Sequence, residues 1–311
     1  MTKPSRPAAD KPRHEGERIA KRLSRAGIAS RRQAEEMILA GRVTVNGKRI
    51  DSPALNVADS DQITVDGRPL AEPERMRLWL YHKPTGLVTT ARDEKGRQTV
   101  FDALPETLPR VMPVGRLDLN SEGLLLLTND GELKRRLELP ATGWLRKYRV
   151  RVHGRPDDAM LAPLREGVVI EGERFQPMLV SIDRQQGANA WLSIGIREGR
   201  NREIRRALES VGLPVSRLIR TGYGPFQLGD LAPGAVREVK ERVLREQLGL
   251  EPASDTADRP ARPAPRKKAH AAKKPTPPGQ RKDAARPQRA GKQAGKPGSA
   301  AQTGKGKPAR R

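Results

Sequence analysis

The chain has 311 residues, with 61 Lys and Arg against 37 Asp and Glu (a formal net charge of +24), and it contains no cysteine. Without cysteine it has no disulfide, no thiolate zinc site and no cysteine nucleophile, which excludes the methyltransferases that attack a pyrimidine through sulfur. Its four histidines are scattered without metal-ligand spacing, no apolar run reaches about 18 residues, and no signal peptide opens the chain. We therefore expect a cytoplasmic protein without a metal or a membrane span.

The two ends of the chain, residues 1–16 and 251–311, have the composition of unfolded polypeptide. Residues 259–311 hold 17 Lys and Arg against one acid, Asp283, and are rich in Pro, Gly and Ala. Such segments cannot bury enough apolar surface to offset the entropy of ordering, so we expect both ends to be disordered. A basic tail suits a polyanion such as RNA, although solubility alone would also explain it.

Residues 17–70 have the pattern of a small domain with two helices and a hairpin. Apolar residues recur at helical spacing in 19–26, and Ser30–Gln33 fits the capping box of a second helix. Asn46-Gly47 between two short strands is a strong signal for a two-residue hairpin, and 62–65 predicts a further strand.

Arg31 and Arg32 lie in the first turn of the second helix, where the helix dipole disfavours cations by roughly 0.3–1 kcal/mol. Their position suggests an external anion, although two solvated arginines would also fit. The helix–helix–hairpin order, with Ala29–Arg32 and Gly41–Gly47, resembles the S4 RNA-binding domain, and the resemblance implies that this helix pair contacts structured RNA. Residues 71–77, rich in charge and proline, then form a linker.

Residues 78–250 alternate short strands and helices and predict a second, α+β domain. Strands are expected at 78–81, 124–127, 148–152 and 190–196, and helices at 132–138, 157–166 and 202–211. We expect a mixed, largely antiparallel sheet flanked by helices. There is no glycine-rich phosphate loop or dinucleotide fingerprint, so nucleotide hydrolysis and SAM or NAD chemistry lack support.

The most informative segment of this domain is a polar loop that leads into an apolar strand. The loop begins Gly115-Arg116-Leu117-Asp118, and the four leucines at 124–127 predict a strand buried on both faces. Asp118 is thereby held beside the rigid centre of a sheet, where a reactive group is well positioned, although aspartate is also common in turns. Pairing of Asp118 with Glu122 as two glycosidase-type carboxylates is an alternative that the basic charge disfavours.

Strict alternation in Lys147–Val152 predicts a strand with one buried face. Tyr148 belongs to the inward set, and the commonest role of such a tyrosine is in the core.

The helix after Asn201, a plausible N-cap, carries three arginines with different predicted directions. Arg205 falls about 60° from the buried Leu208, on the flank of the apolar face. Arg202 and Arg206 point away, so we expect them to contact phosphate or to remain solvated. Arg205 is thus the arginine best placed to enter a partly buried pocket, although it could also be a surface residue.

Three separated segments resemble the signature of the RsuA/RluB family of pseudouridine synthases: Gly115–Gly123, Lys147–Val150 and Glu198–Arg206. The similarity covers roughly residues 17–245, and the third segment is closest to the RluB branch, which acts on 23S rRNA of the large subunit. The resemblance implies a pseudouridine-synthase catalytic domain that isomerises a uridine of ribosomal RNA, an intramolecular transfer that needs no cofactor.

The resemblance also implies roles for individual residues. Asp118 is the expected nucleophile, acting at C1′, C2′ or C6, and Tyr148 would stack on the target base, with its phenol as a possible proton acceptor. Arg205 would pair with Asp118, because an adjacent guanidinium typically lowers a carboxylate pKa by about 1–3 units. Arg116 is the candidate for filling the gap left by the flipped base. Since flipping costs least from a loop or weak pair, we expect a structured hairpin or a pre-ribosomal particle as partner.

Two alternatives remain open from the sequence. The target could lie in 16S rRNA of the small subunit, or the chain could be a catalytically inert RNA-binding factor in ribosome assembly. The set of Asp118, Tyr148 and Arg205 favours the enzyme, because a binding protein needs no ionised acid beside RNA phosphates. We further expect a monomer.

Overall fold

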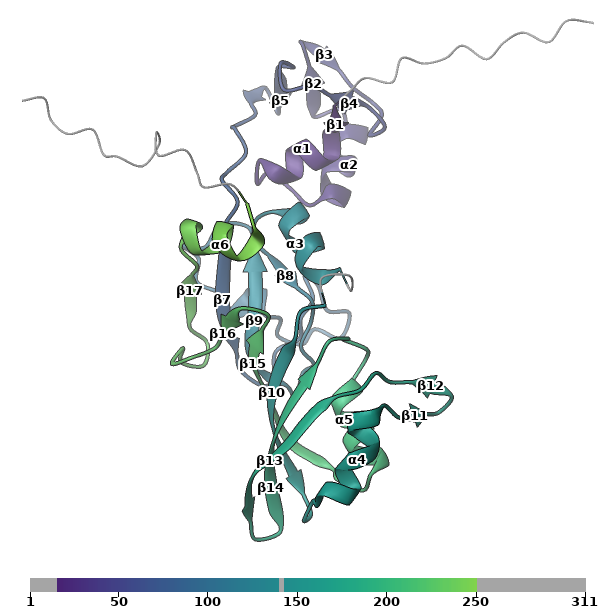
Figure 1. Ribbon diagram of the computed structural model, residues 1–311. Coiled ribbons are helices and arrows are strands. Elements are labelled where there is room, and N and C mark those ends of the chain that lie inside the picture. Colours follow the sequence, from purple (N-terminus) through teal and green to yellow (C-terminus); the bar gives the residue numbers. More distant parts are fainter. Residues whose placement is uncertain (1–15, 140–142, 251–311) are drawn as a thin grey trace, which may run out of the picture. The chain divides into compact units, whose positions relative to one another are not determined.

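The computed structural model describes residues 16–139 and 143–250 (Figure 1). The predictions of disorder at 1–16 and 251–311 lie outside these residues, except that the structure describes Gly16.

The first domain contains two helices and short strands, as predicted. Its elements are β1 (Glu17–Arg18), α1 (Ile19–Arg25), α2 (Arg31–Leu39), β2 (Val43–Val45), β3 (Lys48–Arg49), β4 (Asn56–Val57), β5 (Ile63–Val65) and β6 (Arg68–Pro69). The predicted capping box is confirmed, because Gln33 N–H donates to Ser30 Oγ at 3.2 Å and Ser30 N–H donates to Gln33 Oε1 at 3.0 Å. The predicted hairpin is also confirmed: Asn46 and Gly47 have φ values of 49° and 76°, the left-handed pair that a tight hairpin turn requires.

The second domain is built on one large sheet. Its elements are β7 (Leu78–Lys83), the 3₁₀ turn η1 (Phe101–Ala103), β8 (Met112–Val114), β9 (Glu122–Thr128), α3 (Gly131–Glu138), β10 (Arg146–His153), α4 (Asp158–Glu166), β11 (Val169–Ile170), β12 (Glu173–Arg174), β13 (Leu179–Gln186), β14 (Asn189–Ile196), α5 (Glu203–Ser210), β15 (Val215–Tyr223), β16 (Phe226–Gln227), β17 (Val236–Glu238) and α6 (Glu241–Leu248). The strand order is β13-β14-β10-β15-β9-β7-β17, with β16 on β15 and β8 on β9. Among the strand pairs of this sheet in residues 16–139 and 143–250, the β15–β9 pair alone is parallel, so the expected mixed, largely antiparallel sheet is confirmed.

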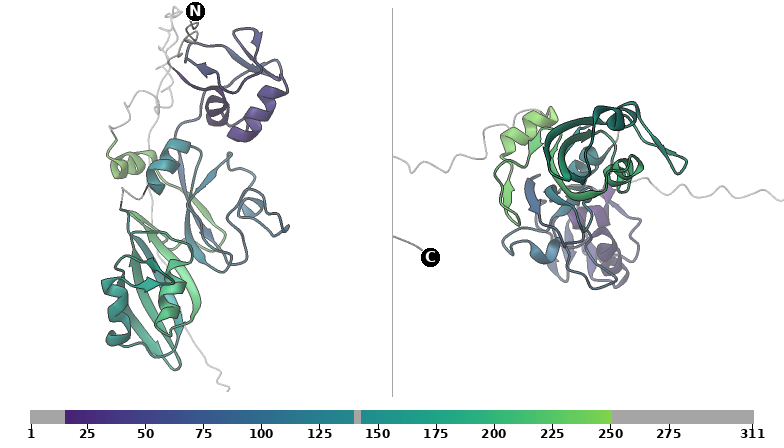
Figure 2. Two further views of the ribbon diagram at one scale, coloured as in Figure 1. Left: turned by 90° about the vertical axis from the view of Figure 1, so that its right-hand side faces the viewer. Right: turned by 90° about the horizontal axis from the view of Figure 1, so that it is seen from below.

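Helices cover both faces of this sheet, and the leucines of β9 contact both layers. Leu125 and Leu127 belong to the core under α4 and α5, whereas Leu124 and Leu126 belong to the core under α3 and α6. Figure 2 shows α4 and α5 together beside β10, β13 and β14. All four leucines are fully buried, so the prediction of a strand buried on both faces is confirmed.

The parallel junction of β9 and β15 depends on a glycine. Gly123 pairs with Arg220 and has a φ of +103°, and a Cβ at this position would lie 2.3 Å from the carbonyl oxygen of Arg220. Only glycine allows this approach. The junction brings β15 to the end of the Asp118 loop, a contact between residues about 100 positions apart in the chain.

The elements of this domain that were not predicted are η1, β8, β11, β12, β13, β15, β16, β17 and α6. Within 16–139 and 143–250, no helix is long and apolar enough to cross a membrane.

Candidate active site

A cavity of about 280 Å³ lies where the loop before β9 meets β10, β15 and the start of α5. The residues of its wall that matter here are Arg116, Asp118, Tyr148, Arg202, Glu203 and Arg220. The structure thus brings together four residues that the sequence singled out and two that it did not. Of the other candidates, Arg205 is absent from the wall, and Arg31 and Arg32 lie exposed at the start of α2.

Lys83, a residue that the sequence reasoning missed, binds the backbone of the Asp118 loop from the end of β7. Its side chain is 0% exposed, and its ammonium donates to the carbonyl oxygens of Pro84 (3.0 Å), Asp118 (3.1 Å) and Ser121 (2.9 Å). Burial lowers the pKa of Lys83 to about 8, against the opposing effect of the carboxylates of Asp118 and Glu122. The signal was present in the sequence, because a lysine at the end of a largely apolar strand has to find buried acceptors.

The carboxylate of Asp118 is partly exposed at the mouth of the cavity, and its nearest cation is not the expected one. Arg202 Nη1 lies 3.9 Å from Asp118 Oδ2, with the two side chains 49% and 36% exposed. Such a long, half-exposed pair contributes little to stability, but it leaves the carboxylate accessible to a substrate.

Arg205 contacts the backbone of the loop rather than the carboxylate. Its Nη2 donates to the carbonyl of Asn120 at 2.8 Å and its Nη1 to that of Val215 at 3.3 Å. Burial and the nearby Arg202 lower the pKa of Arg205, and Asp118 opposes this. Arg205 therefore links the Asp118 loop to β15, and it acts on Asp118 through the backbone.

The prediction that Asn201 caps the helix was wrong, and this error explains the direction of Arg202. Helix α5 begins at Glu203, and the N-cap is Arg202 in the left-handed conformation with a φ of 49°. The helical projection that turned Arg202 away does not apply to a residue outside the helix.

Arg206 is held by ion pairs on the far side of α5. Its Nη1 lies 2.6 Å from Glu173 Oε2, its Nη2 lies 3.1 Å from Glu171 Oε2, and its guanidinium packs over the ring of Phe175. The expectation that Arg206 contacts phosphate or is solvated is therefore corrected: it fastens the β11–β12 hairpin to α5.

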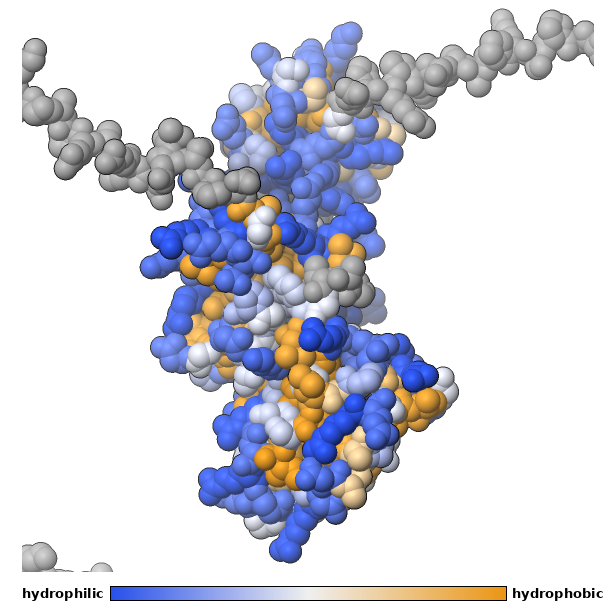
Figure 3. All heavy atoms as spheres, viewed as in Figure 1, coloured by the Kyte–Doolittle hydropathy of each residue, from blue (hydrophilic) through white to orange (hydrophobic). Residues whose placement is uncertain are grey.

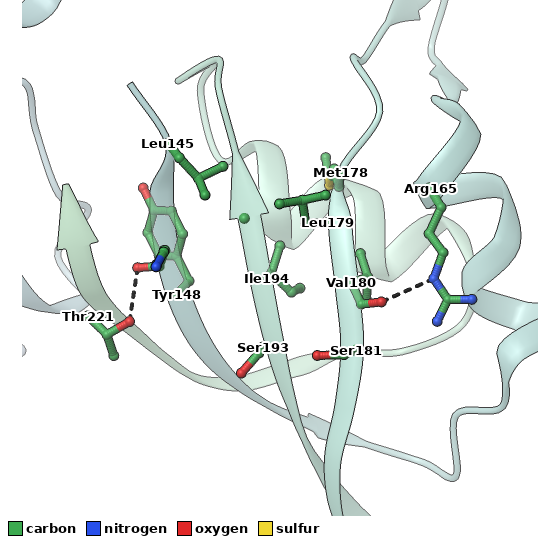
Figure 4. A pocket seen from close by; sticks show the side chains of 12 residues that line it. Leu145, Tyr148, Arg165, Met178, Leu179, Val180, Ser181, Ser193, Ile194 and Thr221 are labelled. Atoms are coloured by element: carbon green, nitrogen blue, oxygen red, sulfur yellow. Dashed lines mark hydrogen bonds between the residues drawn. The ribbon is translucent and has the colours of Figure 1, made fainter. Parts of the chain in front are cut away.

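Tyr148 is 8% exposed and faces inward, while Lys147, Arg149 and Arg151 face out, as the alternation predicted. Its ring also borders a second, larger cavity of about 500 Å³ between β10, β13 and β14 (Figure 4). That cavity is lined by apolar side chains such as Leu145, Met178 and Leu179 and has no carboxylate in its wall. Figure 3 shows apolar residues gathered over these strands. The smaller cavity, which contains Asp118, is the better candidate for chemistry.

Glu203 and Arg220 are two buried ionisable residues that sequence reasoning missed. Glu203 accepts a hydrogen bond from the backbone N–H of Arg200 at 3.0 Å, and burial raises its pKa. Arg220 is 2% exposed and donates from Nε to the carbonyl of Leu124 at 2.6 Å. In the part of the chain that the structure describes, no group of three or more His, Asp or Glu side chains could hold a metal ion.

Comparison with known proteins identifies the family of the chain. The sequence matches the S4 domain over residues 17–63 and the family of RNA pseudouridylate synthases over residues 77–210. It is 46% identical over 231 residues to an uncharacterized RNA pseudouridine synthase of Rickettsia prowazekii, which covers 74% of this chain and 97% of the relative. It is 44% identical over 264 residues to the ribosomal large subunit pseudouridine synthase B of Haemophilus influenzae, which covers 82% of this chain and 74% of the relative. The fold is also that of a pseudouridylate synthase crystal structure, with a TM-score of 0.52 at 24% identity over 75% of this chain and 100% of that one.

Proposed function

The chain belongs to the family of RNA pseudouridine synthases and is an enzyme of that class, and we propose that it converts a uridine of large-subunit ribosomal RNA to pseudouridine with Asp118 as the nucleophile. The observation that carries this assignment is the shared cavity of Asp118 and Tyr148. It places an accessible carboxylate beside an aromatic ring in a space large enough for a nucleoside.

The reaction breaks the bond between C1′ and N1 and forms one between C1′ and C5. No atom is added and no electron is exchanged with a co-reactant, so a nucleophile, a surface that holds the detached base and a proton acceptor for C5 suffice. Asp118 supplies the first. Tyr148 stacks on the base, and its phenol is the candidate acceptor.

Three cations support the nucleophile in different ways. Lys83 and Arg205 hold the backbone of its loop, and Arg202 lies beside its carboxylate. Since a reacting group must be held to within a fraction of an ångström, the backbone contacts contribute to the rate by positioning.

The relatives named ribosomal large subunit pseudouridine synthase B, 42–44% identical to this chain, support 23S rRNA as the substrate. Arg31 and Arg32 at the start of α2 are placed on an exposed surface that suits RNA phosphates, and Arg116 at the cavity rim suits the space left by a flipped base. A ribosomal RNA substrate also supports the expected cytoplasmic location, and we expect the enzyme to act as a monomer.

The test is carbodiimide primer-extension mapping of ribosomal RNA from cells with and without the gene. One reverse-transcription stop in 23S rRNA should vanish with the gene and return with the wild-type chain. A lost stop in 16S rRNA instead would move the substrate to the small subunit, and an unchanged pattern in both RNAs would favour an inert assembly factor.

A variant separates catalysis from binding. Asp118→Asn should lower isomerisation by about 10⁴-fold or more while RNA affinity stays similar or rises, because a negative charge near phosphates is removed. Asp230→Asn is the matched control, since Asp230 forms an exposed ion pair with Arg237 away from the cavity. Loss of RNA binding by Asp118→Asn with unchanged turnover would contradict the assignment.

A further inference from the structure

Arg220 is a buried cation without a counter-ion. It is 2% exposed, and of its guanidinium nitrogens Nε donates to the Leu124 carbonyl, while Nη2 is buried without a hydrogen-bond partner. Among the residues that the structure describes, no carboxylate lies within 4.0 Å of it. Burying an uncompensated charge is costly, so this arrangement suits a site that an anion enters.

The strand register places Arg220 beside the ring that holds the base. On β15 it is the direct neighbour of Tyr148 on β10, and both residues line the cavity. Side chains directly opposite each other on an antiparallel pair share a face, with Cβ atoms about 4.5–5.5 Å apart. A base stacked on Tyr148 is therefore within reach of the guanidinium.

Two contacts fix Arg220 in this position. On the other edge of β15 it pairs with Gly123, whose missing side chain allows the two backbones to meet. Its guanidinium also lies 5.4 Å from the centre of the Tyr223 ring, which accepts the approach of a cation. The charge is thus positioned before the substrate arrives.

We propose that Arg220 is a catalytic residue that stabilises the uracil anion released from the ribose. This inference rests on the proposed function. When the C1′–N1 bond breaks, its electron pair stays on N1, and the charge spreads over O2 and O4 of the base. The Asp118 carboxylate bonds to C1′ as N1 leaves, and it is displaced again when C5 attacks C1′. The C5 proton then leaves and a proton is taken up at N1, so the sum of atoms and electrons is unchanged.

Arg220 suits this task better than the other cations of the site. A guanidinium is always charged and presents several donors in one plane, which matches carbonyl oxygens. The ammonium of Lys83 is occupied by three backbone carbonyls, and Arg202 lies at the half-exposed mouth, where water weakens its field. Preorganised charge in a dry site is the stronger stabiliser.

The test varies the stability of the leaving group. Unmodified 23S rRNA is transcribed with uridine or with 5-fluorouridine, whose fluorine makes the uracil anion more stable. On the fluorinated RNA the reaction cannot end in pseudouridine, because fluorine takes the place of the C5 proton. Single-turnover rates of wild type, Arg220→Gln and Arg220→Lys are therefore measured on both RNAs as loss of the starting nucleoside, which reports cleavage of the C1′–N1 bond, by chromatography of nuclease digests. Arg237→Gln on β17 is the control variant, because its ion pair with Asp230 is exposed and remote from the cavity.

Arg220→Gln should slow isomerisation of the uridine RNA by about 100-fold or more. On the fluorinated RNA its deficit should shrink at least tenfold, because a more stable anion needs less help. If circular dichroism shows that the glutamine variant does not fold, Arg220→Lys is used for the test instead. Its loss of rate on the uridine RNA should be smaller than that expected for glutamine, and it should shrink on the fluorinated RNA in the same way.

Equal deficits on both RNAs would overturn the inference and leave a structural role. A defect only in RNA affinity would also overturn it, because it would make Arg220 a phosphate ligand. An inactive wild type would refute the proposed function itself, whereas an active wild type with fluorine-independent deficits would refute only the role of Arg220.

Discussion

Replacement of Lys83 by methionine tests whether the buried lysine holds the nucleophile loop. The change keeps an unbranched side chain that is one atom shorter, and it removes three hydrogen bonds from an ammonium to the carbonyls of Pro84, Asp118 and Ser121. Hydrogen bonds to charged groups contribute about 1.5–3 kcal/mol each. The desolvation of the ammonium offsets part of this sum, because a pKa of about 8 instead of 10.5 corresponds to about 3.4 kcal/mol.

The free energy of unfolding should therefore fall by about 3 kcal/mol, which for a folded region of this size lowers Tm by about 6–12 °C. Single-turnover rates on 23S rRNA transcript should fall about 100-fold at 25 °C, where the variant is still folded, because the Asp118 loop loses its anchor. RNA affinity measured by filter binding should change little. Unchanged Tm and turnover would show that the loop holds its position without Lys83.

The same lysine predicts an unusual dependence of stability on pH. Because its pKa is lowered in the folded state, the unfolded chain binds more protons between about pH 8 and pH 10.5. The free energy of unfolding of the wild type relative to Lys83→Met should thus rise as the pH increases from about 8 to 10.5. Below pH 8 it should stay at its lower value, because Lys83 is protonated in both the folded and the unfolded chain. Urea unfolding of both proteins at pH 7, 9 and 10.5 measures this difference, and a constant difference would refute the lowered pKa.

Three further variants test other contacts. Gly123→Ala should lower the free energy of unfolding in urea by about 3 kcal/mol or more, because a Cβ would meet the Arg220 carbonyl oxygen at 2.3 Å. The control Gly172→Ala, at a φ of +79° with open space around it, should lower it by only about 1 kcal/mol. Equal losses would leave backbone strain as the sole cause. Arg202→Gln should change stability by less than about 0.5 kcal/mol yet slow turnover roughly tenfold, and a normal rate would mean that its 3.9 Å approach to Asp118 is incidental. Deletion of 259–311 should reduce the slope of log affinity against log salt if its 17 basic residues contact RNA, and an unchanged slope would leave the tail a solubility element.

Features that depend on neighbouring residues could be predicted from the sequence. The capping box of α2, the Asn46-Gly47 hairpin, the alternating strand around Tyr148 and the doubly buried leucines of β9 are all recorded in local spacing. The Asp118 loop was recognisable for the same reason, since its glycines and polar residues precede that strand directly. Local geometry was sufficient there because propensity, turn chemistry and hydrophobic period agree.

Features that depend on pairing between distant segments appear only in the tertiary structure. Strand β13 lacks an alternating pattern because most of its side chains are exposed. Strand β15 is defined by its pairing with a distant segment, since its Arg220 lies opposite Gly123 of β9. The partner of Asp118 depended on a single left-handed residue, Arg202, at the helix start. Lys83 and Arg220 are ordinary basic residues in the sequence; the low dielectric of the buried sheet, far from competing water, is what makes their charges matter to the site.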